Sequence, residues 1–114
     1  MDVEVIQGIQ MIIRARGTID LSNVERFRVP LEDAARESPK GFVIDLSGVT
    51  YIDSAGIQAI IGAYKILMNS GGRISLIITD RNVKEILTIT GLNQLPGFSI
   101  CDTLEAAEQA LSDE

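Results

Sequence analysis

Hydrophobic positions along the chain follow two periods that alternate from one segment to the next. Short runs of β-branched and aliphatic residues predict strands, and apolar positions three or four apart over a longer window predict helices. We expect strands over residues 3–6, 9–15, 42–46, 74–78 and 98–101. Helices are expected between Ser22 and Ser38, over about 54–69, from Asp80 or Asn82 to Gly91, and after Thr103. Strands that alternate with helices of this length predict an α/β fold with helices packed on a sheet.

The first two strands are expected to form a hairpin, because Gln7-Gly8 is typical of a tight turn between them. Gly17 is expected to end this unit. The hairpin makes the sheet mixed, with four or five strands and about four helices mainly on one face. After the apolar central strand, residues 47–53 are expected to form a loop.

The first helix carries two boundary signals. Ser22 followed by Glu25 has the spacing of a capping box and predicts a helix start at Ser22. Pro30 lies inside the apolar pattern that follows. Because proline removes a helical hydrogen bond, we expect either a kink or a helix that begins near Val29.

Composition places the chain among globular proteins. Its 114 residues suit one domain over 1–114, and 46% hydrophobic with 23% charged residues is the balance of a folded chain. Ten basic against sixteen acidic residues give a net charge of −6, which disfavours nucleic acid and anionic membranes as partners. No apolar run approaches the ~18 residues of a membrane span, and the N-terminus lacks a basic secretory start. We therefore expect a cytoplasmic protein.

The sequence argues against most enzyme chemistry. It contains no histidine, which removes Ser-His-Asp and Cys-His activation and imidazole metal ligands, and Cys101 is its only cysteine. Neither Gly-x-Ser-x-Gly nor a phosphate-binding Gly-x-x-x-x-Gly-Lys-Ser/Thr loop is present. We therefore expect no enzyme activity, no bound metal and no cofactor. A nucleotide-binding or hydrolytic enzyme is the weakest of the functions considered.

Residues 43–57 are the most informative segment. A buried-type strand ends at Asp45-Leu46-Ser47, and Asp53-Ser54-Ala55-Gly56-Ile57 opens the long second helix. This segment resembles the STAS domain family, and specifically the stand-alone anti-sigma factor antagonists of bacteria. The signature of that family is an apolar strand ending in Asp-Leu-Ser, followed by Asp-Ser-x-Gly-Leu at a helix start.

The resemblance covers about the whole chain. The segment Gly17-Thr18-Ile19-Asp20 matches an earlier Gly-x-Leu-Asp element, residues 72–78 match a Gly-x-Leu-x-Leu strand, and Gly91-Leu92 matches the glycine after the third helix. The resemblance implies a single STAS-like α/β domain.

The resemblance also implies a function. Ser54 would be the phosphate acceptor of a serine protein kinase that is itself an anti-sigma factor. The unphosphorylated form would bind that kinase and free a sigma factor, phosphorylation would end the binding, and a serine phosphatase would reset the switch. Asp20 and Asp53 would lie near the serine.

The same residues also fit structural roles. A serine at a helix start is an ordinary N-cap, and Asp53 could equally act as a cap or interact with the helix dipole. Asp20 and Ser47 suit turns, although Ser47 is also a possible second modification site. A non-switching scaffold, such as a STAS subunit of a transport or stress-signalling complex, is the alternative function.

The second helix has two faces at ~100° per residue. One is expected to be core and holds Ile57, Ile60, Ile61, Tyr64, Leu67 and Met68. The opposite face is low in relief and suits partner docking, although single exposed apolar residues are common. The candidate partner-binding residues on it are Ala55, Gln58, Ala59, Gly62, Lys65 and Ile66.

Overall fold

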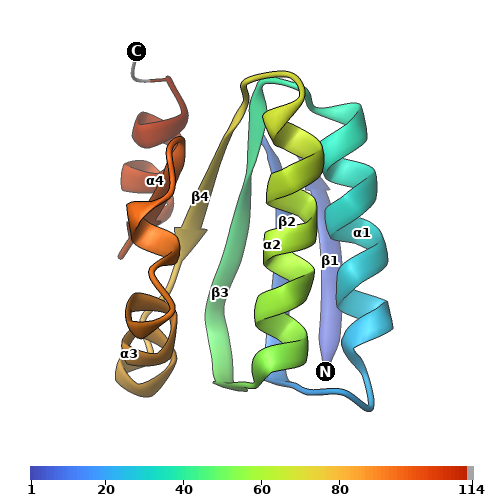
Figure 1. Ribbon diagram of the computed structural model, residues 1–114, viewed down its shortest axis with the longest axis vertical. Helices are drawn as coiled ribbons and strands as arrows, with labels where there is room; N and C mark the ends of the chain where they lie inside the picture. The colour runs from blue at the N-terminus through green and yellow to red at the C-terminus, as the bar shows by residue number, and fades with distance from the viewer. Residues whose placement is uncertain (113–114) are drawn as a thin grey trace.

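The computed structural model describes residues 1–112, which form one mixed five-stranded sheet with helices on both faces (Figure 1). The strands are β1 (Asp2–Gln7), β2 (Met11–Ile19), β3 (Gly41–Ile52), β4 (Arg73–Ile77) and β5 (Phe98–Cys101). The helices are α1 (Val24–Glu37), α2 (Ser54–Met68), α3 (Arg81–Ile89) and α4 (Leu104–Ser112), with a 3₁₀ turn η1 (Leu92–Gln94). The mixed α/β architecture expected from the alternating pattern is confirmed.

The strands lie in the sheet in the same order as in the chain, β1-β2-β3-β4-β5. β1 pairs antiparallel with β2, as expected for a hairpin, and the other neighbours are parallel. Each parallel pair therefore needs a crossover, which α1, α2 and the α3–η1 segment supply.

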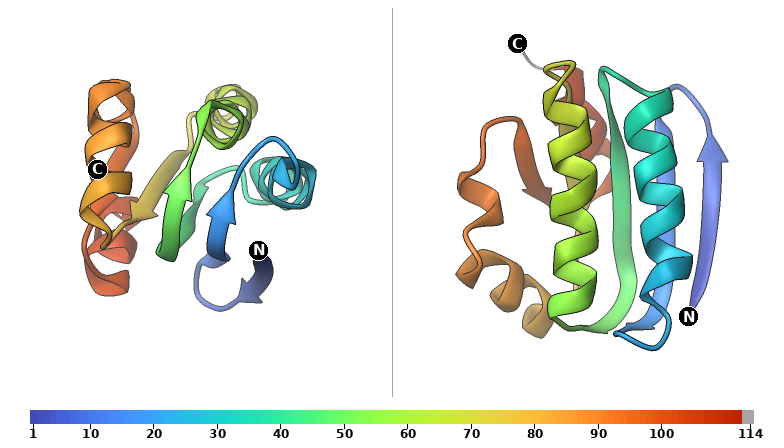
Figure 2. Two further views of the ribbon diagram at one scale, coloured as in Figure 1. Left: turned by 90° about the horizontal axis from the view of Figure 1, so that it is seen from below. Right: turned by 45° about the vertical axis from the view of Figure 1, so that its right-hand side comes forward.

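Side chains alternate between the two faces of the sheet, and each face has its own core. Phe42, Ile44 and Leu46 of β3 belong to the large cluster under α1, α2 and α3. Val43 points the other way, into a small cluster with Ala107 of α4. Figure 2 shows α1 and α2 side by side over the sheet. The helices therefore lie mainly on one face, as expected.

The first helix begins at Val24, and its N-cap is Asn23. The capping box predicted at Ser22 is wrong, because the Ser22 hydroxyl donates to Asp20 and Glu25 pairs with Arg28. The alternative start near Val29 is also wrong. The helix continues through Pro30, since its buried face of Val24, Phe27, Leu31, Ala34 and Ala35 packs on the sheet and outweighs one lost hydrogen bond.

Two strand boundaries also differ from the expected ones. β2 begins at Met11 and continues past Gly17 to Ile19. Most of the expected loop over 47–53 is strand, because β3 extends to Ile52. The two extensions pair with one another across register shifts, with Ile19 opposite Ile52. This paired extension carries the start of α2 to the far end of the sheet.

None of the helices within residues 1–112 combines the length and apolar character needed to cross a membrane.

Asp45 and Arg14 join the two central strands on the α4 side of the sheet. Nε of Arg14 donates to Oδ2 of Asp45 at 2.9 Å, and the backbone N–H of Ser47 donates to Oδ1 at 2.9 Å. Burial alone would raise the pKa of the buried Asp45, but the hydrogen bonds from Ser47 and Arg14 outweigh it, so the pKa lies below its ordinary value. The ionised carboxylate therefore stabilises the fold.

Gly56 lies in the first turn of α2, where the helix approaches the ends of β2 and β3. A Cβ atom at Gly56 would lie 2.6 Å from Cγ1 of Ile52 and 2.9 Å from Cγ2 of Ile19. At Gly62 in the same helix, the nearest atom to an added Cβ would be Oε2 of Glu32, at 3.9 Å. Close packing therefore requires glycine at the first position and not at the second.

We expect Asp45→Asn to lower the free energy of unfolding at pH 7 by about 1–2 kcal/mol, because the amide keeps an acceptor for Ser47 and loses the charge facing Arg14. A carboxyl with a lowered folded-state pKa stabilises the fold above its unfolded-state value and loses that contribution as the pH falls through the folded-state pKa. The difference from wild type should be steady above about pH 5 and shrink below about pH 4. Urea titrations over this range measure it, and a difference independent of pH would contradict the assignment.

Gly56→Ala is expected to lower the free energy of unfolding by about 1–3 kcal/mol through overpacking, although alanine is the better helix former. Gly62→Ala is the matched control and should raise it by up to about 1 kcal/mol. Thermal and urea unfolding of both variants provide the measurement. Equal stabilisation by the two substitutions would show that the first turn of α2 is not closely packed.

Candidate phosphoacceptor site and partner-binding surface

Ser54 is the first residue of α2, but it does not cap the helix. The N-cap is Asp53, whose Oδ1 accepts a hydrogen bond from the backbone N–H of Ala55 at 2.9 Å. Ser54 is exposed, and its hydroxyl has no hydrogen-bond partner within residues 1–112. The N-cap role considered for Ser54 is therefore wrong, and the hydroxyl is free to meet a reagent or a partner from outside.

The turn between β2 and α1 lies against the start of α2. The backbone N–H of Asp53 donates to the carbonyl of Ile19 at 3.2 Å, which ties the two segments together. Asp20 follows Ile19 directly, and its Oδ1 accepts from the backbone N–H and the hydroxyl of Ser22. The hydrogen bond from the Ser22 hydroxyl contributes most to lowering the pKa of Asp20. Asp20 therefore organises its own turn beside the serine.

The outer face of α2 differs in part from the face expected. Gln58 and Lys65 are exposed and Ile60 is buried, as expected, while Ile61 and Gly62 are half-buried. Ala59 is buried, so its place in the partner-binding set is wrong. Ile66 and Ala55 are half-buried and pack against the large core, so neither is a freely exposed apolar residue.

These corrections have one cause. The buried residues of α2 are Gly56, Ala59, Ile60, Ala63, Tyr64 and Leu67. Three of them are small: Gly56 lies against Ile52 and Ile19 of the strands, and Ala59 and Ala63 suit a helix that packs more closely beside α1 than on the sheet. The sequence analysis assigned the core face to the largest apolar residues of the helix. The buried face instead includes the small residues, and Ile57 and Met68 lie at its margins, where they are half-buried.

The sequence analysis did not identify two exposed apolar residues at the same end of the sheet as the serine. Leu21 lies in the turn beside α2 and is 79% exposed, and Tyr51, near the end of β3, is 50% exposed. Large exposed apolar side chains beside polar ones are typical of protein-binding surfaces. The sequence does contain a sign that Leu21 is exposed: it lies between the polar residues Asp20 and Ser22, outside any segment with helical or strand periodicity.

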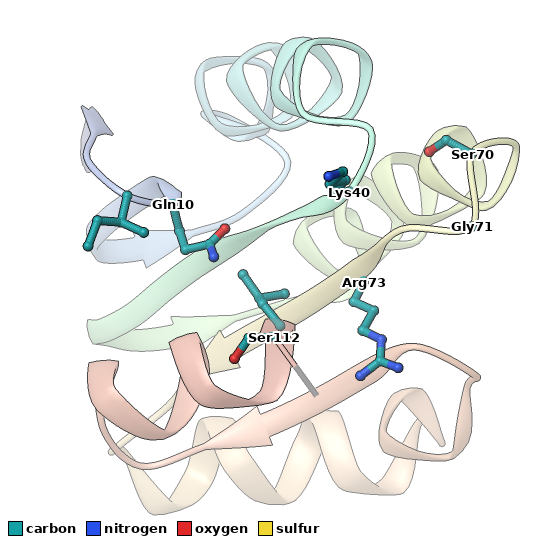
Figure 3. A pocket seen from close by; sticks show the side chains of 8 residues that line it. Gln10, Lys40, Ser70, Gly71, Arg73 and Ser112 are labelled. Carbon is teal, nitrogen blue, oxygen red and sulfur yellow. The ribbon is translucent and has the colours of Figure 1, made fainter. Parts of the chain in front are cut away.

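The opposite end of the sheet holds a hollow of about 590 Å³. Figure 3 shows Gln10, Lys40, Arg73 and Ser112 around it. The last carbonyls of α2 and α4 point to this end, where Arg73 donates to the carbonyl of Ala110 at 3.3 Å and Ser70 to that of Leu67 at 2.9 Å. Arg73 thus meets the carbonyl end of α4, so the hollow is a weaker candidate than the start of α2 for binding an anion.

Within residues 1–112, no three His, Cys, Asp or Glu side chains come close enough to hold a metal ion. Cys101 is half-buried, and burial raises the pKa of its thiol. The site at the start of α2 therefore offers a free hydroxyl, the N–H groups of a helix end and a surface for a partner.

The chain has relatives among known proteins, in sequence and in structure. The STAS domain family model matches residues 1–107. The chain is 26% identical over 83 residues to an anti-sigma F factor antagonist of Paenibacillus polymyxa, covering 72% of this chain and 71% of that protein.

Solved structures share the fold. An anti-sigma factor antagonist from Mycobacterium paratuberculosis superposes with a TM-score of 0.86 at 23% identity, over 98% of this chain and 94% of that one. The phosphorylated form of the Bacillus cell fate determinant SpoIIAA superposes with a TM-score of 0.71 at 20% identity, over 95% and 97% of the two chains. With the family model matched over nearly its whole length, this chain belongs to the STAS domain family.

Proposed function

We propose that this protein is an anti-sigma factor antagonist switched by phosphorylation of Ser54. In the unphosphorylated form it binds an anti-sigma factor that is also a serine kinase, and a sigma factor is released. Phosphorylation ends the binding, and a serine phosphatase restores it. The observation that carries the proposal is the exposed, unpaired hydroxyl of Ser54 at a helix start whose capping is done by Asp53.

Relatives support the proposal. The Paenibacillus polymyxa protein is an anti-sigma F factor antagonist, and SpoIIAA has been solved in a phosphorylated form. The proposal assigns no catalytic residue to this chain, because the kinase and the phosphatase supply the chemistry. It also places the chain in the bacterial cytoplasm, where transcription takes place.

Phosphorylation of Ser54 should leave the fold intact. A phosphate adds about −1.5 to −2 charges and three acceptor oxygens. At the first residue of α2 these charges meet free N–H groups and the positive end of the helix dipole, while Asp53 opposes them in part. The switch therefore acts on the surface that the partner contacts and not on the stability of the domain.

The proposed partner-binding surface surrounds Ser54. It includes the exposed Gln58 and Lys65 of α2, with the edges of Ala55, Gly62 and Ile66. We add Leu21 and Tyr51 as apolar contacts. A partner that covers the neutral hydroxyl would have to bury a dianion after phosphorylation, which costs several kcal/mol when the charge is unpaired. About 1.4 kcal/mol already lowers affinity tenfold.

Ser54→Ala should bind the partner as the wild type does and should not be phosphorylated, because it lacks the hydroxyl. Ser54→Asp should weaken binding at least tenfold, because it places a charge in the interface, and should leave the melting temperature unchanged. The measurement is titration of the serine-kinase anti-sigma factors of the same organism, with mass-spectrometric mapping of the phosphorylated residue.

Ser47 is the matched control serine, because it is also exposed and lies at a distance along β3 from the start of α2. Ser47→Asp should leave binding unchanged. Phosphate found on Ser47 or Thr50, or tight binding by Ser54→Asp, would overturn the proposal. Stable association with a transporter or stress complex regardless of the residue at 54 would favour the scaffold function.

Leu21→Ala is expected to weaken partner binding about tenfold, because it removes an exposed apolar side chain beside the switch serine without disturbing the core. Ile89→Ala is the control, since Ile89 is equally exposed at 80% but lies at the end of α3. Calorimetric titration compares the two. Equal affinities would remove Leu21 from the interface while leaving the role of Ser54 open to its own test.

A further inference from the structure

A shallow groove separates α1 from β1, on the side of α1 that faces away from α2. Figure 2 (right) shows β1 at the margin of the sheet, with α1 between it and α2. Two adjoining hollows form the groove and share Val5, Val29 and Pro30. Arg26 and Glu25 line one hollow, where Glu25 is already paired with Arg28, and Asp33 and Glu37 line the other. The groove is therefore apolar in the middle and acidic at one end, and at the other end Arg26 is the cation that lines it.

The middle of this groove is exposed. Val5 on β1 is 53% exposed and Val29 on α1 is 47% exposed. β1 is the first strand of the sheet order and pairs only with β2 among the described residues, so half of its backbone groups face outward. An edge strand beside exposed apolar side chains is a template for pairing with another chain.

The charges indicate which chain fits. Arg26 lies three or four residues before the centre of the exposed stripe at Val29 and Pro30, and Asp33 lies the same distance after it. If a second α1 ran antiparallel about that centre, Arg26 of each copy would face Asp33 of the other, with Glu37 close by. The same operation places Val5 and Val29 of one copy against those of the other. The groove is thus complementary to itself.

The charged ends are available for such contacts. One nitrogen of Arg26, Nη2, donates to the backbone carbonyl of Met1 at 2.6 Å. Asp33 has a distant ion pair with Arg36, at 4.0 Å, and both side chains are largely exposed. A partner arginine can therefore reach Asp33 without breaking a buried contact.

We propose that the α1–β1 groove is a homodimer interface. Two copies associate about a twofold axis, so that β1 and α1 of one copy run antiparallel to β1 and α1 of the other. The occupant of the groove is a second copy of this chain. Because the groove lies on the other side of α1 from α2, both Ser54 hydroxyls stay accessible in the dimer, and the inference stands apart from the proposed switch.

The test is charge reversal, measured by sedimentation velocity over a concentration series. Arg26→Asp and Asp33→Arg should each raise the dimer dissociation constant at least tenfold. The twofold axis creates two Arg26–Asp33 pairs, and either substitution turns both into pairs of like charge. The double variant exchanges the two charges and should return the dissociation constant to within about threefold of wild type.

Folding and specificity have their own controls. Each variant should melt within a few degrees of wild type, because both residues are exposed. Val5→Lys should also give a monomer, whereas Ile89→Lys, which places a lysine on an equally exposed apolar site far from the groove, should leave the dimer intact.

A wild-type chain that stays monomeric up to about 1 mM would overturn the proposal. So would a dimer that both single reversals leave unchanged, or one that the double reversal fails to restore. Loss of partner binding in Ser54→Asp and Leu21→Ala, with the dimer intact, would show that the two surfaces act separately.

Discussion

The close approach of the first turn of α2 to the ends of β2 and β3 is the constraint on which the rest of the site depends. Gly56 allows that approach, because any larger residue would meet Ile52 and Ile19. The bond from Asp53 to the Ile19 carbonyl fixes the helix start against the turn that holds Asp20 and Leu21. Because Gly56 packs the inner side of the first helical turn against the strands, Ser54 lies on the solvent-exposed side of that turn. This contact therefore fixes the position of Ser54 relative to Asp20, Asp53 and the exposed apolar side chains nearby.

Much of the fold could be predicted from periodicity. The expected strand over 98–101 and the buried positions of α1 agree with the structure, because these segments bury one face that side-chain pattern alone reveals. The extension of β3 could not be predicted in this way. Ser47, Gly48 and Thr50 are polar or small and exposed, yet the segment pairs with β2 through its backbone. Backbone pairing leaves no mark on a pattern of side chains, so the segment had the composition of a loop.

The candidate site was found from a motif, and its surroundings were found less well. Ser54 and Asp53 lie where the motif placed them, at the start of a long helix. Ala59 was placed on the wrong face because an estimate of the core based on large side chains misses the places where alanine and glycine allow backbones to approach. Leu21 and Tyr51 belong to no periodic segment of the kind used to find helices and strands. Only the pairing of β2 with β3 and the contact of α2 with the adjoining turn bring them to the same end of the sheet.

The order of the strands has a consequence for how the chain assembles. Because the order in space repeats the order in sequence, each new strand adds to an edge that already exists, and none has to be inserted between two others. Neighbouring strands are then separated in the sequence by no more than one helix and its connections. Contacts between residues so close in the sequence favour fast folding. During synthesis, the segment from β1 to α2 can pack on itself before β4 and β5 leave the ribosome. The half of the domain that carries Ser54 is thus the half that is synthesised first, and the C-terminal strands and helices complete the core that it shares with them.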